Sequence, residues 1–168
     1  MWILGRLLKF SSLLILYLIF FSQLSTVSAK QPGYLNDMEL NSLSFTSYEN
    51  INPNLLVYPL KRVSEEIKLK LLKSPEQKRG YMYGLYEIRL RELVYIVNNK
   101  KEGFIFFTAD RYNSFVGKIK KEYPLDANLK MKFQDHIKLL ERLRDIYPAS
   151  SLYWEKIQQT IDTTRSLI

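Results

Sequence analysis

Two charged residues, Arg89 and Glu92, have a spacing that could support a specific polar interaction. They are three residues apart in a segment with a helical pattern, so their side chains lie on one helix face. The same face carries Met82, Leu85 and Ile88, which puts both charges at the edge of an apolar stripe. A half-buried arginine needs a carboxylate partner because an unpaired buried charge is very costly. The pattern fits a binding site for an anionic group or an ion pair that fixes the register of two helices, and we favour the ion pair.

The single histidine of the chain, His136, is the other side chain that could do chemistry, as a general base. No Ser, Asp or Glu is placed by sequence to form a triad with it, and one histidine cannot build a multi-histidine metal site. The chain has no cysteine, which excludes disulfides, thiolate chemistry and a lipid anchor on cysteine. Neighbouring carboxylates such as Glu65 and Glu66 point to different sides of a helix, and no P-loop, dinucleotide-binding or zinc-binding spacing occurs. We therefore predict no catalytic residue, no cofactor and no metal.

The basic residues gather in the middle of the chain. The formal net charge is +8, and most of this excess lies between Val57 and Glu122, whereas residues 30–56 are slightly acidic. Such a surface could bind anionic lipid heads, a wall polymer or another envelope protein of acidic character. The plainer interpretation is a solvated, lysine-rich surface. We expect no nucleic-acid partner.

The N-terminal residues have the order of a secretory signal. Two basic residues, Arg6 and Lys9, precede an apolar stretch, and small polar residues follow as far as Ala29. This order predicts cleavage between Ala29 and Lys30. The alternative is an uncleaved membrane anchor formed by residues 10–29, which are long enough to span a bilayer. In both cases the basic N-terminus stays in the cytoplasm, so the rest of the chain is extracytoplasmic, either secreted or anchored.

The remainder of the chain is predicted to be a linker followed by one helical domain. Residues 30–54 contain Pro, Gly, Asn and Ser without a helical stripe, and we interpret them as the linker. Residues 55–168 predict an all-α fold, a small bundle of about five helices, with 55–122 as its first part and 123–168 as a C-terminal helical pair. The first predicted helix covers residues 55–73, with its regular part beginning at Pro59 after a turn. The others cover residues 75–97 and 101–122, then a fourth helix from Asp126 to the residue before Pro148, and a fifth from Ser150 or Ser151 onward.

The first two predicted helices carry the clearest local signals. Ser74 and Gln77 form a capping box, so a tight turn joins the two helices. Further along, residues 104–107 could alternatively form a short strand, although the sequence offers no second strand to pair with it. In the first helix Lys61 and Glu65 lie largely opposite an apolar stripe. That stripe, which we expect to be the buried face, consists of Leu56, Leu60, Val63, Ile67 and Leu71.

Three groups of residues between Asn52 and Lys121 form a recognisable pattern: Leu56–Arg62 with Glu65, Ser74–Lys78, and Arg89–Leu93. In this pattern the chain resembles a bacterial extracytoplasmic helical domain family of unknown function. This family is found behind signal peptides or single membrane spans, and it brings no catalytic activity or cofactor. Gly80 and Gly84 depart from the Ala or Leu expected in its second helix. The resemblance implies a polar clasp between the first two helices, formed by Tyr58, Lys61, Glu65, Arg89 and Glu92.

The sequence thus predicts an exported, non-enzymatic interaction or structural module of the cell envelope. Its partner would be another envelope protein, anionic lipid or a wall polymer. One alternative is a small envelope hydrolase that uses His136 with a carboxylate. Another is a ligand-sensing domain with a pocket between the third and fourth helices.

Overall fold

The computed structural model describes residues 51–168, and these residues are all-α, as predicted. They contain five α-helices and no strand. The alternative strand at residues 104–107 is therefore wrong, because this segment ends a short 3-10 helix and begins an α-helix. The predicted signal, its cleavage site at Ala29 and Lys30, and the linker as far as residue 50 lie outside the described residues. The elements are α3 (Tyr58–Leu71), α4 (Pro75–Asn98), η2 (Glu102–Phe104), α5 (Ile105–Glu122), α6 (Ala127–Arg144) and α7 (Leu152–Arg165).

Local sequence signals determine where the longer helices begin. The Ser74 hydroxyl accepts a hydrogen bond from the backbone N–H of Gln77 at 3.3 Å, and the Asp126 carboxylate accepts one from the N–H of Leu129 at 2.8 Å. Ser151 caps α7 in the same way. Each cap satisfies a backbone donor that has no partner within its own helix, which stabilises the first turn. The sequence predicted the cap at Ser74, the start of α6 at Asp126, and the start of α7 at Ser150 or Ser151.

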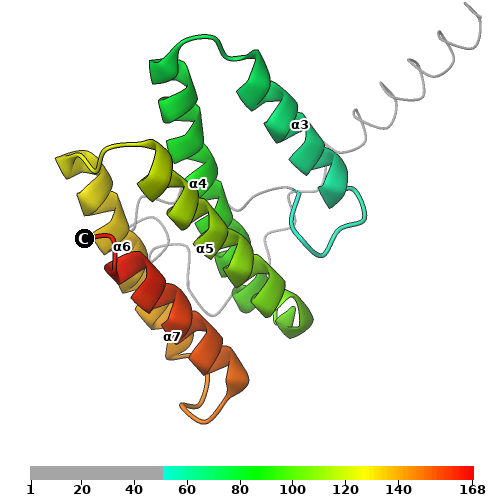
Figure 1. The fold of residues 1–168 in the computed structure, drawn as a ribbon. Helices are drawn as coiled ribbons and strands as arrows, with labels where there is room; N and C mark the ends of the chain where they lie inside the picture. The colour runs from blue at the N-terminus through cyan, green and yellow to red at the C-terminus, as the bar shows by residue number, and fades with distance from the viewer. Residues whose placement is uncertain (1–50) are drawn as a thin grey trace, which may run out of the picture. The chain divides into compact units, whose positions relative to one another are not determined.

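Helices α4 to α7 enclose the hydrophobic core. Figure 1 shows α4 and α5 side by side, with α7 next to α5 and α6 next to α7. Between residues 51 and 168, no helix is both long enough and apolar enough to cross a membrane. The core side chains that are fully removed from solvent include Met82, Leu90, Leu93 and Ile96 of α4, Ile105, Val116 and Ile119 of α5, Leu129, Phe133 and Leu140 of α6, and Ile157 and Ile161 of α7.

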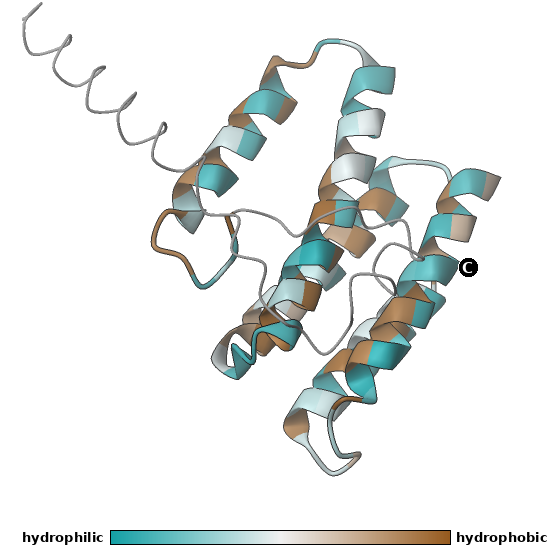
Figure 2. Cartoon of the chain, turned by 180° about the vertical axis from the view of Figure 1, so that it is seen from behind, coloured by the Kyte–Doolittle hydropathy of each residue, from teal (hydrophilic) through white to brown (hydrophobic). Residues whose placement is uncertain are grey.

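Helix α3 packs differently, and the prediction of its buried face is wrong. The apolar stripe that we expected in the core points to solvent, with between 52% and 100% of each side chain exposed. Figure 2 shows hydrophobic and hydrophilic residues alternating along this helix. The opposite side carries Tyr58 and Glu65, and both are buried. The helix is amphipathic as predicted, but it turns its polar side toward the protein.

Candidate functional site: helix α3 and its polar clasp

The polar clasp begins with a turn that places Tyr58 at the start of α3. The backbone N–H of Leu55 donates to the carbonyl of Asn52, and that of Tyr58 donates to the carbonyl of Leu55, both at 3.0 Å. Pro59 then occupies the beginning of the helix, where its missing N–H costs no intrahelical bond. The turn and the proline together direct the Tyr58 side chain into the protein, where it is 4% exposed.

Arg89 lies at the centre of the clasp. Its side chain is fully buried in the middle of α4, and its Nη1 donates to both carboxylate oxygens of Glu92 at 2.5 and 2.6 Å. Its Nη2 donates to Glu65 of α3. One guanidinium therefore joins a carboxylate of its own helix to a carboxylate of the neighbouring helix. We expected Arg89 and Glu92 at the edge of the apolar stripe of α4, but both are completely buried.

Two residues of α3 complete the surroundings of Glu92. The Tyr58 hydroxyl donates to Glu92 Oε2 at 2.8 Å, and Lys61 Nζ donates to Glu92 Oε1 at 2.9 Å. The structure thus brings together all five residues that the resemblance placed in the clasp. Burial by itself would raise the pKa of Glu92, but the charges of Arg89 and Lys61 outweigh it and hold that pKa below its usual range. Burial and the nearby Glu92 charge raise the pKa of Tyr58 above its usual range, so its hydroxyl remains a donor.

Two arginines that the sequence analysis did not place in the clasp also belong to it. Arg62 donates to Glu65 at 2.5 Å, and Arg111 of α5 donates to the Tyr58 hydroxyl. The Arg111 guanidinium also lies over the Tyr58 ring, 4.6 Å from its centroid. Arg111 shares a helix face with Phe107, four residues earlier, and its guanidinium lies over that ring as well. The spacing of a basic residue four positions after a phenylalanine was the one feature of the sequence that could have indicated Arg111, and it is weakly specific.

The clasp fixes which way α3 faces. Arg89 Nη1 also donates to the Tyr58 hydroxyl at 3.2 Å. Rolling the helix to bury its apolar stripe would pull Glu65 and Tyr58 away from Arg89 and leave a buried guanidinium short of partners. Arg89 is already engaged by two carboxylates and has no exposed surface, so this geometry favours the register-fixing ion pair over a site for an anionic ligand. The polar side of α3 is therefore the side that holds this helix against the rest of the domain.

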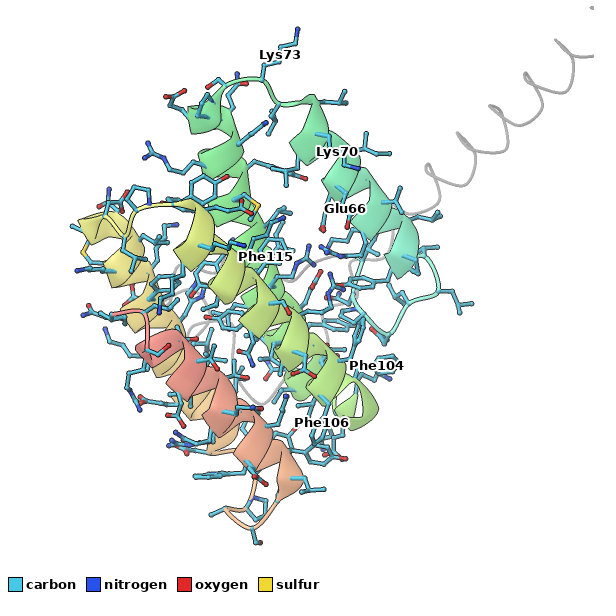
Figure 3. All side chains as sticks on the ribbon, viewed as in Figure 1. Glu66, Lys70, Lys73, Phe104, Phe106 and Phe115 are labelled. Carbon is cyan, nitrogen blue, oxygen red and sulfur yellow. The ribbon has the colours of Figure 1, made fainter. Side chains whose placement is uncertain are left out.

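The outward side of α3 is an apolar surface with charged residues at its margin. We call it the apolar face, and define it by Leu56, Leu60, Val63, Ile67 and Leu71. Lys68 and Lys70 lie on α3 between Ile67 and Leu71, and Lys73 lies in the turn after α3; all three are exposed. Glu66 is the exposed carboxylate of the same helix (Figure 3). Because Glu65 is occupied inside the clasp, the exposed charge beside the apolar face is positive.

His136 lies in a buried polar centre to which four helices contribute one side chain each. The Tyr112 hydroxyl lies 3.1 Å from His136 Nδ1 and 2.7 Å from the Tyr86 hydroxyl, and Thr164 donates to it at 3.5 Å. The imidazole is stacked on the Tyr86 ring, with 4.2 Å between centroids. Burial lowers the pKa of His136 to about 3. With 4% of its surface exposed, this histidine does not reach a substrate, so the geometry gives the hydrolase alternative no support.

Two further features concern possible metal ligands and a possible ligand pocket. No group of three or more His, Asp or Glu side chains that could hold a metal ion occurs between residues 51 and 168. A surface hollow lies between the beginnings of α5 and α7, whereas a sensor pocket was expected between α5 and α6. Its lining consists of Phe106, Leu152, Glu155, Lys156 and Gln159.

No family model matches the chain, and no curated protein and no solved structure is detectably similar to it. The resemblance to a bacterial extracytoplasmic family therefore stays a prediction.

Proposed function

We propose that the protein is an exported, non-enzymatic interaction module of the cell envelope, and that the apolar face of α3 is its binding surface. The observation that carries the proposal is the orientation of α3, whose apolar side is exposed while its polar side is buried. Export is supported by the order of charged, apolar and small residues at the N-terminus.

Exposed apolar side chains are common on proteins when they are scattered singly, but a contiguous group marks a surface that something covers. The apolar face is such a group, since its members follow one another at three- and four-residue spacing along one helix. It is also held in place, because the clasp joins α3 to α4 through Arg89. A surface that the protein holds outward by buried ion pairs is a better candidate for binding than a loosely packed helix.

In-cell photo-crosslinking tests this proposal. A photoreactive amino acid replaces Ile67 in the full chain, and the matched control carries it at Met131 of α6. Both positions are apolar, helical and about equally exposed, at 52% and 56%. We expect a discrete adduct, to lipid, to another envelope component or to a second copy, from position 67 and none from position 131. Equal adducts from both positions, or none from position 67, would reject the proposal.

A further inference from the structure

We infer that the apolar face of α3 docks on an anionic lipid bilayer, with the helix axis along the membrane surface. The inference rests on the proposed function and names the partner of the same surface. An interfacial helix of this kind buries its apolar side at the boundary of headgroups and acyl chains, and its lysines reach the headgroups.

The shape of the apolar face suits a membrane surface. At about 100° per residue, Leu60, Val63, Ile67 and Leu71 fall within roughly 80° of one another around the helix axis. Leu56, which is fully exposed, extends the same surface into the turn before the helix. The face is thus continuous over the length of α3, without a polar residue at its centre.

The charges beside the apolar face match anionic headgroups. Lys70 and Lys73 are exposed at the C-terminal end of α3, and Lys68 lies on the other margin of the face with its Nζ over the Tyr81 ring. Within α3, Glu66 is the one exposed carboxylate beside these lysines (Figure 3). The clasp strengthens this imbalance, because Glu65 is paired with Arg62 and Arg89 and does not neutralise the surface. Each lysine near an anionic membrane strengthens binding about fivefold.

The spacing of the face is less suited to a partner helix. Leu60, Val63 and Ile67 fit the first positions of a coiled-coil seam, but the next seam position is Lys70, and Leu71 lies beside the seam. A seam of this kind ends after one heptad, which is too short for a stable helix pair. A lipid surface requires no such register, because acyl chains adapt to any apolar outline.

The absence of cysteine from the whole chain allows a local test. Val63→Cys and, as a control, Leu152→Cys are labelled with an environment-sensitive fluorophore, and each full chain is reconstituted into vesicles. Both positions are exposed and apolar. The vesicles contain phosphatidylcholine alone or phosphatidylcholine with phosphatidylglycerol. We expect the label at position 63 to shift its emission to the blue and to be several-fold less accessible to an aqueous quencher in the anionic vesicles only, and the label at position 152 to remain accessible in both.

Charge variants test the electrostatic part. In the chain labelled at position 63, Lys70→Gln with Lys73→Gln should lower the docking equilibrium in anionic vesicles by roughly 25-fold, at about fivefold per lysine. The matched control, Lys130→Gln with Lys138→Gln, removes the same charge from exposed positions on α6 and should leave docking unchanged. Circular dichroism shows whether each variant is folded.

Two outcomes would overturn the inference. A label at position 63 that is accessible in both vesicles means that lipid does not cover the face. A label that is shielded equally in neutral vesicles means that the chain itself, a second copy or uncharged lipid covers it. In either case a protein adduct at Ile67 in the crosslinking experiment would leave the proposed function intact, whereas the loss of every adduct would reject both.

Discussion

Replacing Arg89 by methionine should sharply destabilise the protein, because two buried carboxylates depend on this guanidinium. In the variant Glu92 keeps Tyr58 at 2.8 Å and Lys61 at 2.9 Å, and Glu65 keeps Arg62 at 2.5 Å. Breaking a buried ion pair by removing one partner costs about 3–5 kcal/mol. The retained partners place Arg89→Met at the lower end of this range, near 3 kcal/mol.

The expected loss is a large share of the stability of such a domain, which is typically about 5–15 kcal/mol. For a helical domain of this size, 1 kcal/mol corresponds to a change of about 4 °C in the melting temperature. We therefore expect Arg89→Met to melt about 12 °C below the unmodified protein. Thermal unfolding of the full chain in mild detergent at neutral pH, followed by far-ultraviolet circular dichroism, measures this difference.

Arg165→Met is the matched control, because Arg165 also pairs with two carboxylates but at the surface. Its guanidinium lies 2.9 Å from Glu141 and 3.5 Å from Asp162, and 54% of the side chain is exposed. Exposed ion pairs contribute about 0–1 kcal/mol, so this variant should melt at most about 4 °C lower. If Arg89→Met melted no lower than Arg165→Met, the clasp would not hold α3, and the argument for a fixed outward face would fail.

Four further variants test three other parts of the structure. Burial lowers the pKa of His136 from 6.5 to about 3, so between these pH values the unfolded chain binds the proton more tightly than the folded protein does. The free energy of unfolding, measured with denaturant, should therefore fall below pH 6.5 by up to about 1.4 kcal/mol per pH unit. His136→Gln should lack this pH dependence at pH values above those where carboxylates titrate. Ile67→Ser, on the apolar face, should change the free energy of unfolding by less than about 0.5 kcal/mol, whereas Ile157→Ser in the core should lower it by at least about 2 kcal/mol. Equal losses would mean that Ile67 is covered within the folded chain. Ser74→Ala removes the cap of α4 and should cost about 1 kcal/mol in the same measurement, and an unchanged value would contradict the cap.

Local chemistry made most of the fold predictable from the sequence. The caps at Ser74, Asp126 and Ser151 depend on side chains within three residues of the helix start, and the sequence shows these directly. Leu129 and Phe133 of α6 are buried because they belong to a helix with one apolar side and a charged opposite side. In α6 the hydrophobic effect decides which side is buried.

Periodicity could not predict which side of α3 is buried. It shows that Val63 and Ile67 share a face, but the direction of that face depends on what α4 presents. Here α4 presents a buried arginine, and the interaction of Arg89 with Glu65 joins residues 24 positions apart in the chain. Arg111 was missed for the same reason, since 53 positions separate it from Tyr58. No local spacing encodes a contact of this range.

The polar centre around His136 shows the same limit. The sequence places His136 beside Phe133 and Leu140 on a helix, where a hydrogen-bonded histidine is expected more often than a catalytic one. It does not show that Tyr86 and Tyr112, from two other helices, supply the stacking and the hydrogen bond. Those partners follow only from the packing of α4, α5 and α6.

The division between α3 and the four-helix core also has a consequence for local unfolding. A helix that contributes few side chains to the core and is held by one ion cluster can detach as its own cooperative unit while α4 to α7 stay folded. Amide protons of α3 should therefore exchange with solvent at a free energy set by the clasp, well below that of the core helices. The protein would then have two free energies of unfolding, one for the core and a lower one for the helix that carries the apolar face.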